Sequence, residues 1–341
     1  MSFVRFAQTD IVNDTARITT STWTNNTNEL TSAHLTSSTQ AVFTSPTSSG
    51  AHFIEVYNAD PASDTTAEVQ YAVAYGHRLG SGSEHFTHAV GGFGKSPSRN
   101  IYSQYRQLVF GSETSDFKFT DHTPDDIYVI NVNRSRYKHN LKPGSLNLKI
   151  GTQILTDDSI TSTGSSTTTN AGRQFNIVSG SNGVRFGSSN VSVTNSGSYG
   201  FFYPDSGFIV LNADCLDATV ADGGLALATD VTTNNQSDNH LKFLNKIHTG
   251  ASFIVDSEEK VSSTYYFARA RNFEFNYTTN PSFIDNNGNV LLNSMIDNPT
   301  SYITTVGMYN DNGDLLAVAK LSQPVTKDFT KEALIRVKLD Y

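Results

Sequence analysis

The sequence contains one cysteine, Cys215, in 341 residues. A single thiol excludes an internal disulfide framework and any zinc or redox site of the Cys-x-x-Cys type. Cys215 lies in NADCLDA without a histidine nearby in sequence to activate it, so we expect a buried, unreactive side chain. Stability must therefore come from packing and from strand pairing.

Long apolar segments are also missing. No run approaches the roughly 18 residues of a membrane-spanning helix, and the first residues, MSFVRFAQTD, lack the apolar core of a secretory signal. We therefore expect no membrane partner and a chain that folds in a reducing cytosol.

Charge is scarce too, at 16% of residues, with 24 Lys and Arg against 32 Asp and Glu. The net charge of −8 and a pI of about 5.5 lack the basic field that attracts nucleic acid, so no nucleic-acid partner is expected. The chain is instead rich in Ser, Thr and Asn, and its 11% aromatic residues supply core material. This composition is typical of a β-rich protein with long polar loops.

Apolar residues recur with a period of two in several segments, which predicts β-strands. In AEVQYAVAY (67–75) the β-branched and aromatic residues share one parity: Val69, Tyr71, Val73 and Tyr75. A helix is the alternative there because alanine is frequent, but that shared parity favours a strand. DIYVINVNRSRY (126–137) alternates as well, and Lys142-Pro143-Gly144 supplies a turn after it.

The last 85 or so residues, about a quarter of the chain, are the most regular. ITTVGMY (303–309) and LLAVAKL (315–321) flank Asn312-Gly313, which predicts a β-hairpin. A strand is predicted up to Tyr341. Apolar residues also alternate from Tyr265 to Tyr277, interrupted by two arginines, and we expect a bulge or a change of face there.

Two short helices are predicted. SRNIYSQYRQLVFG begins with a capping Ser98, places Ile101, Tyr105, Leu108 and Val109 on one face, and stops at Gly111. A second helix is expected over 238–249.

These patterns predict a mainly β fold, built as an antiparallel β-sandwich with one or two short helices and a polar, Gly/Ser/Thr-rich insertion. We expect short strands beyond Arg173 in that insertion, with a flexible loop as the alternative. The expected divisions are an N-terminal extended segment (1–50), a β-rich domain (51–155), a polar insertion or protrusion (156–250) and a C-terminal sheet (251–341).

No motif predicts catalysis, a cofactor or a metal. Residues 89–96, AVGGFGKS, resemble a phosphate-binding loop, but Pro97 follows at once and no buried apolar strand precedes it, so we reject a nucleotide site. His77, His85 and His88 could share a metal, yet loop histidines are more often solvated. DHTPDD (121–126) and IDNNGN (284–289) are interpreted as turns rather than calcium sites.

A basic cluster stands out in this acidic chain, and we consider it a possible interface: Arg134, Arg136, Lys138 and Lys142. Contact with an acidic neighbouring subunit and a solvated strand end are both open interpretations.

Several segments resemble a structural protein of contractile-tailed phages, especially the myoviruses of marine cyanobacteria. They are DIVND (10–14), YGH (75–77) with GSG (80–82), IYSQYR (101–106), FARARNFEFNYTTNPSF (267–283) and ITTVGMYNDNGDLLAVAKLSQPV (303–325). The resemblance covers most of the chain outside the polar 156–200 tract and implies no catalytic residues. It implies a virion protein of the tail, in the baseplate or the fibre-attachment region.

The expected function is therefore non-enzymatic: assembly with other virion proteins and with further copies of the chain. A neck or head-proximal virion protein is the nearest alternative. A glycan- or receptor-binding module of the tail fibre is another, favoured if aromatic residues of 76–96 or 196–204 are exposed. A polysaccharide-degrading enzyme is the third and requires two opposed carboxylates.

Overall fold

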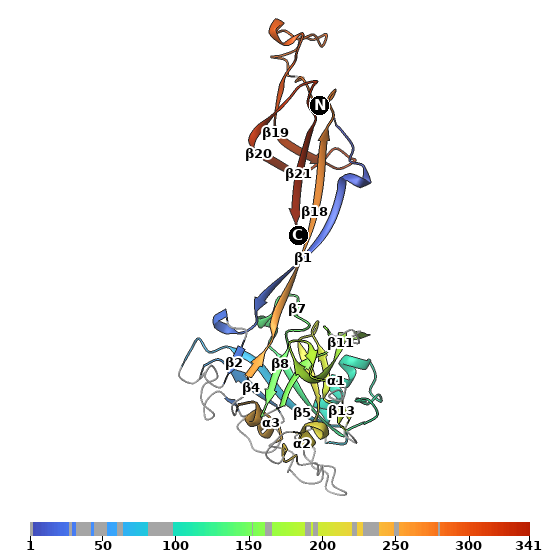
Figure 1. Cartoon of the computed structure of the whole chain (residues 1–341), viewed down its shortest axis with the longest axis vertical. Helices are drawn as coiled ribbons and strands as arrows, with labels where there is room; N and C mark the ends of the chain where they lie inside the picture. The colour runs from blue at the N-terminus through green and yellow to red at the C-terminus, as the bar shows by residue number, and fades with distance from the viewer. Residues whose placement is uncertain are drawn as a thin grey trace. The chain divides into compact units, whose positions relative to one another are not determined.

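The structure, a computed structural model, describes residues 3–26, 29–31, 42–43, 53–59, 64–80, 98–151, 153–160, 166–187, 192–193, 197–219, 224–227, 239–248, 252–278 and 280–341. The described chain is mainly β-structure in antiparallel sheets, which confirms the predicted fold class (Figure 1). It divides into two compact units: unit 1 comprises residues 1–17 and 260–341, and unit 2 comprises residues 18–259.

Unit 2 is built on one 13-stranded sheet. Its strands run in the order β2 (Glu29–Thr31), β17 (Ser252–Ile254), β8 (Asn147–Ile150), β9 (Gln153–Asp157), β11 (Gly172–Ser181), β15 (Gly200–Tyr203), β16 (Phe208–Asn212), β6 (Asp126–Val132), β5 (Val69–His77), β4 (Phe53–Tyr57) and β3 (Val42–Phe43). Two short strands, β10 (Thr167–Thr169) and β12 (Val184–Arg185), pair with β11. A separate ribbon joins β13 (Ser192–Val193) to β14 (Gly197–Ser198).

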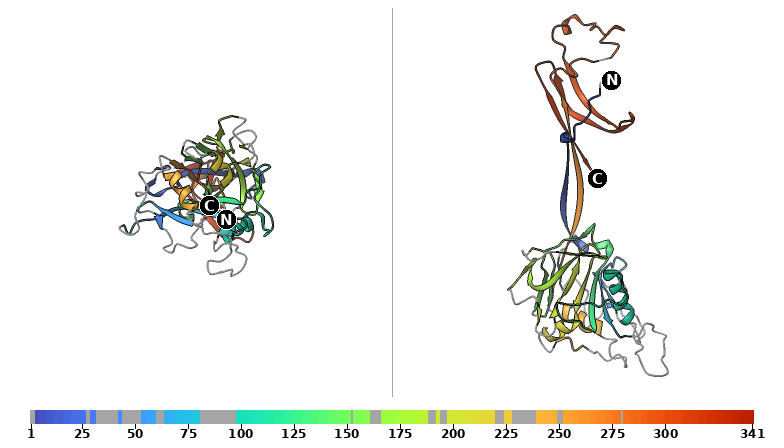
Figure 2. Two further views of the ribbon diagram at one scale, coloured as in Figure 1. Left: turned by 90° about the horizontal axis from the view of Figure 1, so that it is seen from below. Right: turned by 90° about the vertical axis from the view of Figure 1, so that its right-hand side faces the viewer.

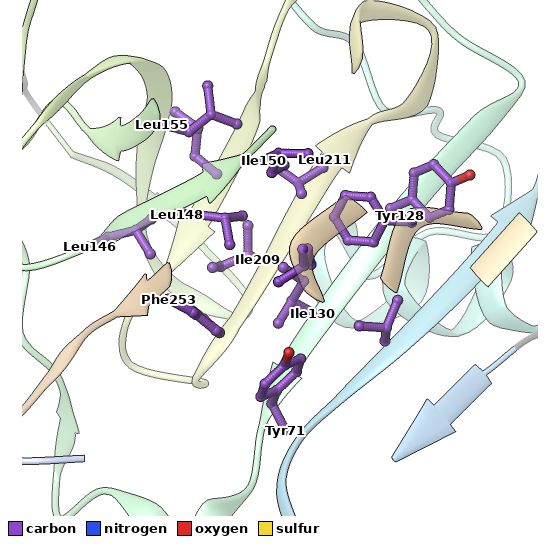
Figure 3. Close-up of a cluster of buried hydrophobic side chains, with 14 of the residues drawn as sticks. Tyr71, Tyr128, Ile130, Leu146, Leu148, Ile150, Leu155, Ile209, Leu211 and Phe253 are labelled. Atoms are coloured by element: carbon purple, nitrogen blue, oxygen red, sulfur yellow. The ribbon is translucent and has the colours of Figure 1, made fainter. Parts of the chain in front are cut away.

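The sheet is curled: strands that are far apart in the strand order lie in contact. The ring of Tyr71 on β5 lies 5.3 Å from that of Phe253 on β17, and the indole Nε1 of Trp23 donates a hydrogen bond of 3.2 Å to the carbonyl of Phe253. Figure 3 shows side chains of β8 and β9 in one cluster with those of β6 and β16. This closure gives the sandwich-like core that was predicted.

Apolar residues are buried on both faces of the sheet. On β6, Tyr128 and Ile130 belong to the cluster in Figure 3, whereas Ile127 and Val129 belong to a second cluster on the opposite face. Helix α3 (Asn239–His248) packs on the first face, where the ring of Phe243 stacks on Tyr128 at 4.5 Å. Helix α1 (Ser98–Phe110) packs on the second.

Both predicted helices are present, and a third, α2 (Ala213–Thr219), was not predicted. Helix α1 spans the predicted residues and ends at Gly111, whose φ of 63° is the left-handed conformation that suits glycine. The predicted buried face was wrong in part: Tyr102 is buried and Leu108 is 43% exposed. The hydroxyl of Tyr102 accepts a hydrogen bond from the backbone N–H of Phe117, which favours this rotation of the helix.

The structure divides the chain differently from the four predicted segments (1–50, 51–155, 156–250 and 251–341). The stretch predicted as a polar protrusion, 156–250, supplies β11, β15 and β16 to the middle of the large sheet. Strand β16 is buried at every position and pairs with β6. Short strands do occur beyond Arg173, as expected, but they belong to the core because their apolar residues face both clusters.

Unit 1 contains two smaller sheets (Figures 1 and 2). In one, β18 (Asp256–Ala270) lies between β1 (Ile11–Ser21) and β21 (Ala333–Asp340), and its pairing with β21 runs from Ser263–Asp340 to Ala270–Ala333. The unit boundary falls inside β1 and β18, and β7 (Asn140–Leu141) of unit 2 pairs with β18 at Ser257 and Glu258. The other sheet is the predicted hairpin, formed by β19 (Ser301–Tyr309) and β20 (Leu315–Lys327).

The predicted alternation from Tyr265 to Tyr277 was wrong in its second half. Strand β18 ends at Ala270, and residues 271–278 form turns in place of a bulged strand. Phe275 adopts a φ of 56°, which a strand does not allow. As a result, Phe273 and Tyr277 are exposed on unit 1 and do not line a sheet.

Candidate functional site

Unit 1 differs from unit 2 in having almost no hydrophobic core. Every residue of the two large buried clusters belongs to unit 2. The buried apolar side chains among the described residues of unit 1 are Ala270, Met308, Ala333 and Val337. A two-stranded ribbon or a small sheet needs an apolar face packed against another element to be stable in water. The described part of unit 1 does not provide that packing from its own residues.

Most of the exposed large apolar side chains of the described residues belong to unit 1. They are Phe3, Val4, Phe6, Ile11, Val12, Phe273, Phe275, Tyr277, Leu291, Leu292, Ile296, Tyr302, Tyr309, Leu315, Leu316, Val318, Val325, Phe329, Leu334 and Tyr341. Monomeric proteins rarely expose apolar patches larger than a few hundred Å² unless the patch is an interaction site. We therefore take this apolar surface of unit 1 as the candidate functional site.

Four of these side chains form what we call the hairpin patch: Phe3, Tyr309, Leu315 and Val318. Gly307 pairs directly with Val318. The side chains of Tyr309 and Leu315 lie over this glycine: their atoms are 3.0 and 3.4 Å from the position that a Cβ would occupy there. The ring of Phe3 meets that of Tyr309 edge-on at 5.2 Å. The hairpin thus presents a continuous apolar cluster to solvent, whereas the neighbouring Met308 is buried.

The turn between β19 and β20 is held by a polar side chain. The Asn310 carboxamide Oδ1 accepts hydrogen bonds from the backbone N–H groups of Asn312 and Asp314, and Gly313 has a φ of 87°. The same chemistry closes the turn at 284–289, where Asp285 accepts from the backbone of Asn287 and Asn289. The side-chain and backbone hydrogen bonds from Asn289 lower the pKa of Asp285. These bonds show that residues 284–289 form a turn, as predicted from the sequence.

Lys327 is a buried cation of unit 1, with no exposed surface. Its Nζ donates to three carbonyl oxygens: the side-chain Oδ1 of Asn276 at 2.5 Å, the backbone O of Asp328 at 2.9 Å and the backbone O of Asn272 at 3.0 Å. Because Lys327 ends β20 and the two asparagines follow β18, this ammonium fixes the turns of 271–278 to the hairpin. It thereby positions the exposed Phe273 and Tyr277.

The β18–β21 ladder sorts its side chains by face. Residues Ala333, Ile335, Val337 and Leu339 are buried or half-buried, whereas the intervening residues are exposed. On the exposed side the Arg336 guanidinium lies over the ring of Tyr265 at 5.5 Å. The predicted last strand is therefore confirmed, and its side chains alternate between a half-buried and an exposed face.

Unit 2 holds a separate cluster of titratable groups where β5 ends and β6 begins. The Tyr75 hydroxyl donates a hydrogen bond to the Asp126 carboxylate, and Nε2 of His77 lies 3.8 Å from the same oxygen. The Nδ1 of His77 accepts from the backbone N–H of Leu79. Nearby, Nε2 of His122 is 2.8 Å from a carboxylate oxygen of Asp214.

Burial governs the protonation of this cluster. It raises the pKa of Asp126 to about 7, and the neighbouring charges of Asp214 and Asp125 act in the same direction. Burial also lowers the pKa of His77, since it disfavours the imidazolium. Asp126 is only 2% exposed and lies within the core. Sequence reasoning missed the cluster because it treated residues 121–126 as a turn.

The stability of unit 2 is expected to depend on pH through these two groups in opposite senses. Asp126 binds more protons in the folded state between about pH 4 and 7, so its contribution is greatest at low pH and is lost as the pH rises toward 7. His77 binds more protons in the unfolded state, so its contribution is lost as the pH falls below 6.5. Asp126→Asn should therefore gain stability relative to the wild type between pH 5 and 8, by up to about 3 kcal/mol.

Urea unfolding at several pH values, followed by the fluorescence of Trp23, measures this gain. Trp23 is the only tryptophan of the chain and is buried in unit 2. Asp121→Asn, at an exposed carboxylate of the same segment, serves as the control and should leave the pH dependence unchanged. Parallel curves for the wild type and Asp126→Asn would contradict the assignment.

The basic cluster proposed from sequence is partly used within the chain. Arg136 Nη1 contacts Glu68 Oε2 at 2.7 Å and Thr24 Oγ1 at 2.6 Å. Arg134 donates to the carbonyl of Tyr137 at 2.6 Å and lies over its ring. Lys138 is exposed and Lys142 is half-buried. The two arginines therefore brace unit 2, and an interface role for the cluster stays a prediction.

The other sequence motifs have the following places. His85, His88 and the segment 89–96 lie outside the described residues. His77 is a buried core residue. Asp125 of the 121–126 segment pairs with Arg78 at 2.6 Å.

Among the described residues, no group of three or more His, Cys, Asp and Glu side chains is arranged to hold a metal ion. Cys215 is buried as expected, and burial raises its pKa to about 12.

Comparison of the chain with protein-family models, with curated proteins and with solved structures found no match. No helix of the described residues is long and apolar enough to cross a membrane.

Proposed function

We propose that this chain is a structural subunit of a contractile-tailed phage virion that acts by subunit assembly and not by catalysis. Its proposed place is the tail, in the baseplate or the fibre-attachment region, and its proposed partners are other virion proteins. The observation that carries the proposal is the apolar surface of unit 1, which exposes many large side chains and buries few. An assembling subunit requires such a surface, because its neighbours complete its packing.

Two of the segments that resemble phage tail proteins lie in the same region. Residues 267–283 and 303–325 both belong to unit 1. They include the exposed turns after β18 and most of the hairpin patch. Unit 1 thus carries the apolar surface together with a part of the resemblance. A neck or head-proximal position would use the same surface and is the nearest variant.

The two other functional classes receive less support. A glycan-binding loop was expected to expose aromatic residues in 76–96 or 196–204. In the second loop Tyr199, Phe201, Phe202 and Tyr203 are buried, and residues 81–96 of the first lie outside the described residues. A polysaccharide-degrading enzyme needs an acid with a raised pKa that reaches the substrate. Asp126 and Asp157 have raised pKa values because they are buried, and burial keeps both from a substrate.

Quantitative mass spectrometry of gradient-purified phage particles tests the proposal. The phage that encodes this chain should carry it at a fixed ratio to the major tail-tube protein, set by a small ring of copies. Tail preparations freed of heads should retain the chain if the tail position is right. Absence of the chain from washed particles would refute the structural role and favour an enzyme instead.

A further inference from the structure

We infer that the apolar surface of unit 1 is covered by other copies of this same chain, with each unit 1 in contact with at least two neighbours. This deepens the proposed function by naming the partner of its assembly surface, and it rests on that function only for the expectation that the chain assembles. Three properties of unit 1 support it: the extent of the surface, its distribution over the unit and the charge of the unit.

The extent of the surface exceeds what one ordinary interface covers. An aromatic side chain buries about 150–250 Å². The exposed apolar side chains of unit 1, each between about one-third and three-quarters exposed, therefore present on the order of 1,500 Å². A standard protein–protein interface covers about 800 Å² on each partner. One neighbour of ordinary size would leave much of this surface in water.

The surface is also spread over the elements of unit 1 other than its central strand β18. It includes Phe3 before β1, Phe273 and Tyr277 in the turns after β18, Val318 on the hairpin and Leu334 on β21. In the described sheet, β1 and β21 are the two end strands, and each has one edge without a partner strand. Copies related by a rotation bring different faces and edges of one unit against each other, which suits a surface distributed in this way.

Charge separates the two units sharply. Unit 1 contains ten Lys and Arg and ten Asp and Glu, which leaves 14 basic and 22 acidic residues in unit 2. The whole net charge of −8 therefore belongs to unit 2, and unit 1 is formally neutral. Neutral surfaces with exposed apolar residues associate without like-charge repulsion, whereas an acidic unit keeps its copies apart in solution. Unit 1 is therefore not suited to bind a strongly basic or strongly acidic partner, because it is formally neutral.

Thiol labelling of the full chain tests the inference. Val318 of unit 1 is 57% exposed in a single chain and Val184 of unit 2 is 49% exposed, so Val318→Cys and Val184→Cys form a matched pair. The native Cys215 adds no background because it is buried and its pKa is raised to about 12. If copies cover unit 1, the introduced thiol of Val318→Cys should react with a maleimide at least tenfold more slowly than that of Val184→Cys. Dilution should speed the slower reaction, because it separates the copies.

Sedimentation or light scattering of the same proteins supplies the mass. The wild type and both cysteine variants should form an oligomer of three or more chains, and Val318→Glu should shift toward the monomer while Val184→Glu does not. Equal labelling rates together with a monomeric wild type at micromolar concentration would overturn the inference. A monomer that is still found in particles at a fixed ratio would refute self-assembly and leave the proposed virion role intact. An oligomer that is absent from particles would support self-assembly and refute the virion role.

Discussion

Replacing Lys327 by methionine is expected to unfold the turns at 271–278 and the end of the hairpin, while unit 2 stays folded. The side chain has no exposed surface, and its ammonium satisfies oxygens of Asn276, Asp328 and Asn272. Methionine has a similar length but donates no hydrogen bond, so the carbonyl of Asp328 and Oδ1 of Asn276 lose this donor inside the protein. Each buried acceptor left without a donor costs about 1–3 kcal/mol, and the local loss should be about 3 kcal/mol or more.

Hydrogen exchange followed by mass spectrometry measures this loss peptide by peptide. Amide protection should fall over 271–278 and 325–330 and stay unchanged in β6 and β16 of unit 2. Lys331→Met is the matched control, because Lys331 is exposed and makes a surface ion pair of 3.2 Å with Asp328. Because the Lys331 ammonium is in solvent, losing this pair should cost little stability. Unchanged protection in Lys327→Met would show that the buried ammonium does not hold these segments together.

Local sequence patterns predicted many elements of this fold. The period of two placed β5, β6 and β21, and Asn312-Gly313 placed the hairpin. Ser98 and Gly111 marked both ends of α1. In each case the signal lies in neighbouring residues: alternating side chains, a turn that favours positive φ, or a helix cap. Such signals act at short range and can be read without the rest of the chain.

The parts that sequence did not predict depend on contacts between distant segments. Phe208 to Asn212 form a central strand because β6 and β15 flank them, although the surrounding Gly- and Ser-rich residues suggested a protrusion. Tyr102 rather than Leu108 faces the sheet because Phe117 supplies a partner for its hydroxyl. Asp126 acquires its raised pKa from a fold that buries it beside Tyr75 and His77, and DHTPDD alone gave no sign of that burial.

The candidate site was missed for a related reason. An apolar residue at a strand position predicts burial, so the alternating apolar residues from Tyr265 to Tyr277 were interpreted as residues of a strand. Only the folded chain shows that unit 1 has too few elements to cover them. A sequence pattern specifies that a face is apolar, but it does not specify whether that face is covered by the same chain or by another.

Ending the chain after Ala333 is expected to abolish the order of unit 1 and to leave a protein that is insoluble or does not assemble. The deletion removes all of β21 beyond its first residue, including the buried Val337 and the half-buried Ile335 and Leu339. It also leaves β18 from Ser263 to Arg269 without its pairing to β21. Because unit 1 has so few buried apolar residues, loss of one strand removes a large share of its packing.

The soluble fraction after expression and the mass of the soluble protein measure this outcome, with Trp23 fluorescence as the check that unit 2 has folded. Lys338→Gln is the control in the same strand: it removes an exposed ion pair with Asp340 and a cation–π contact with the ring of Tyr265, and it should leave solubility and mass unchanged. Soluble truncated protein with the oligomeric mass of the wild type would mean that β21 contributes neither to the order of unit 1 nor to assembly. Soluble but monomeric truncated protein, with unit 2 intact, would place the subunit contacts on the part of the chain that depends on β21.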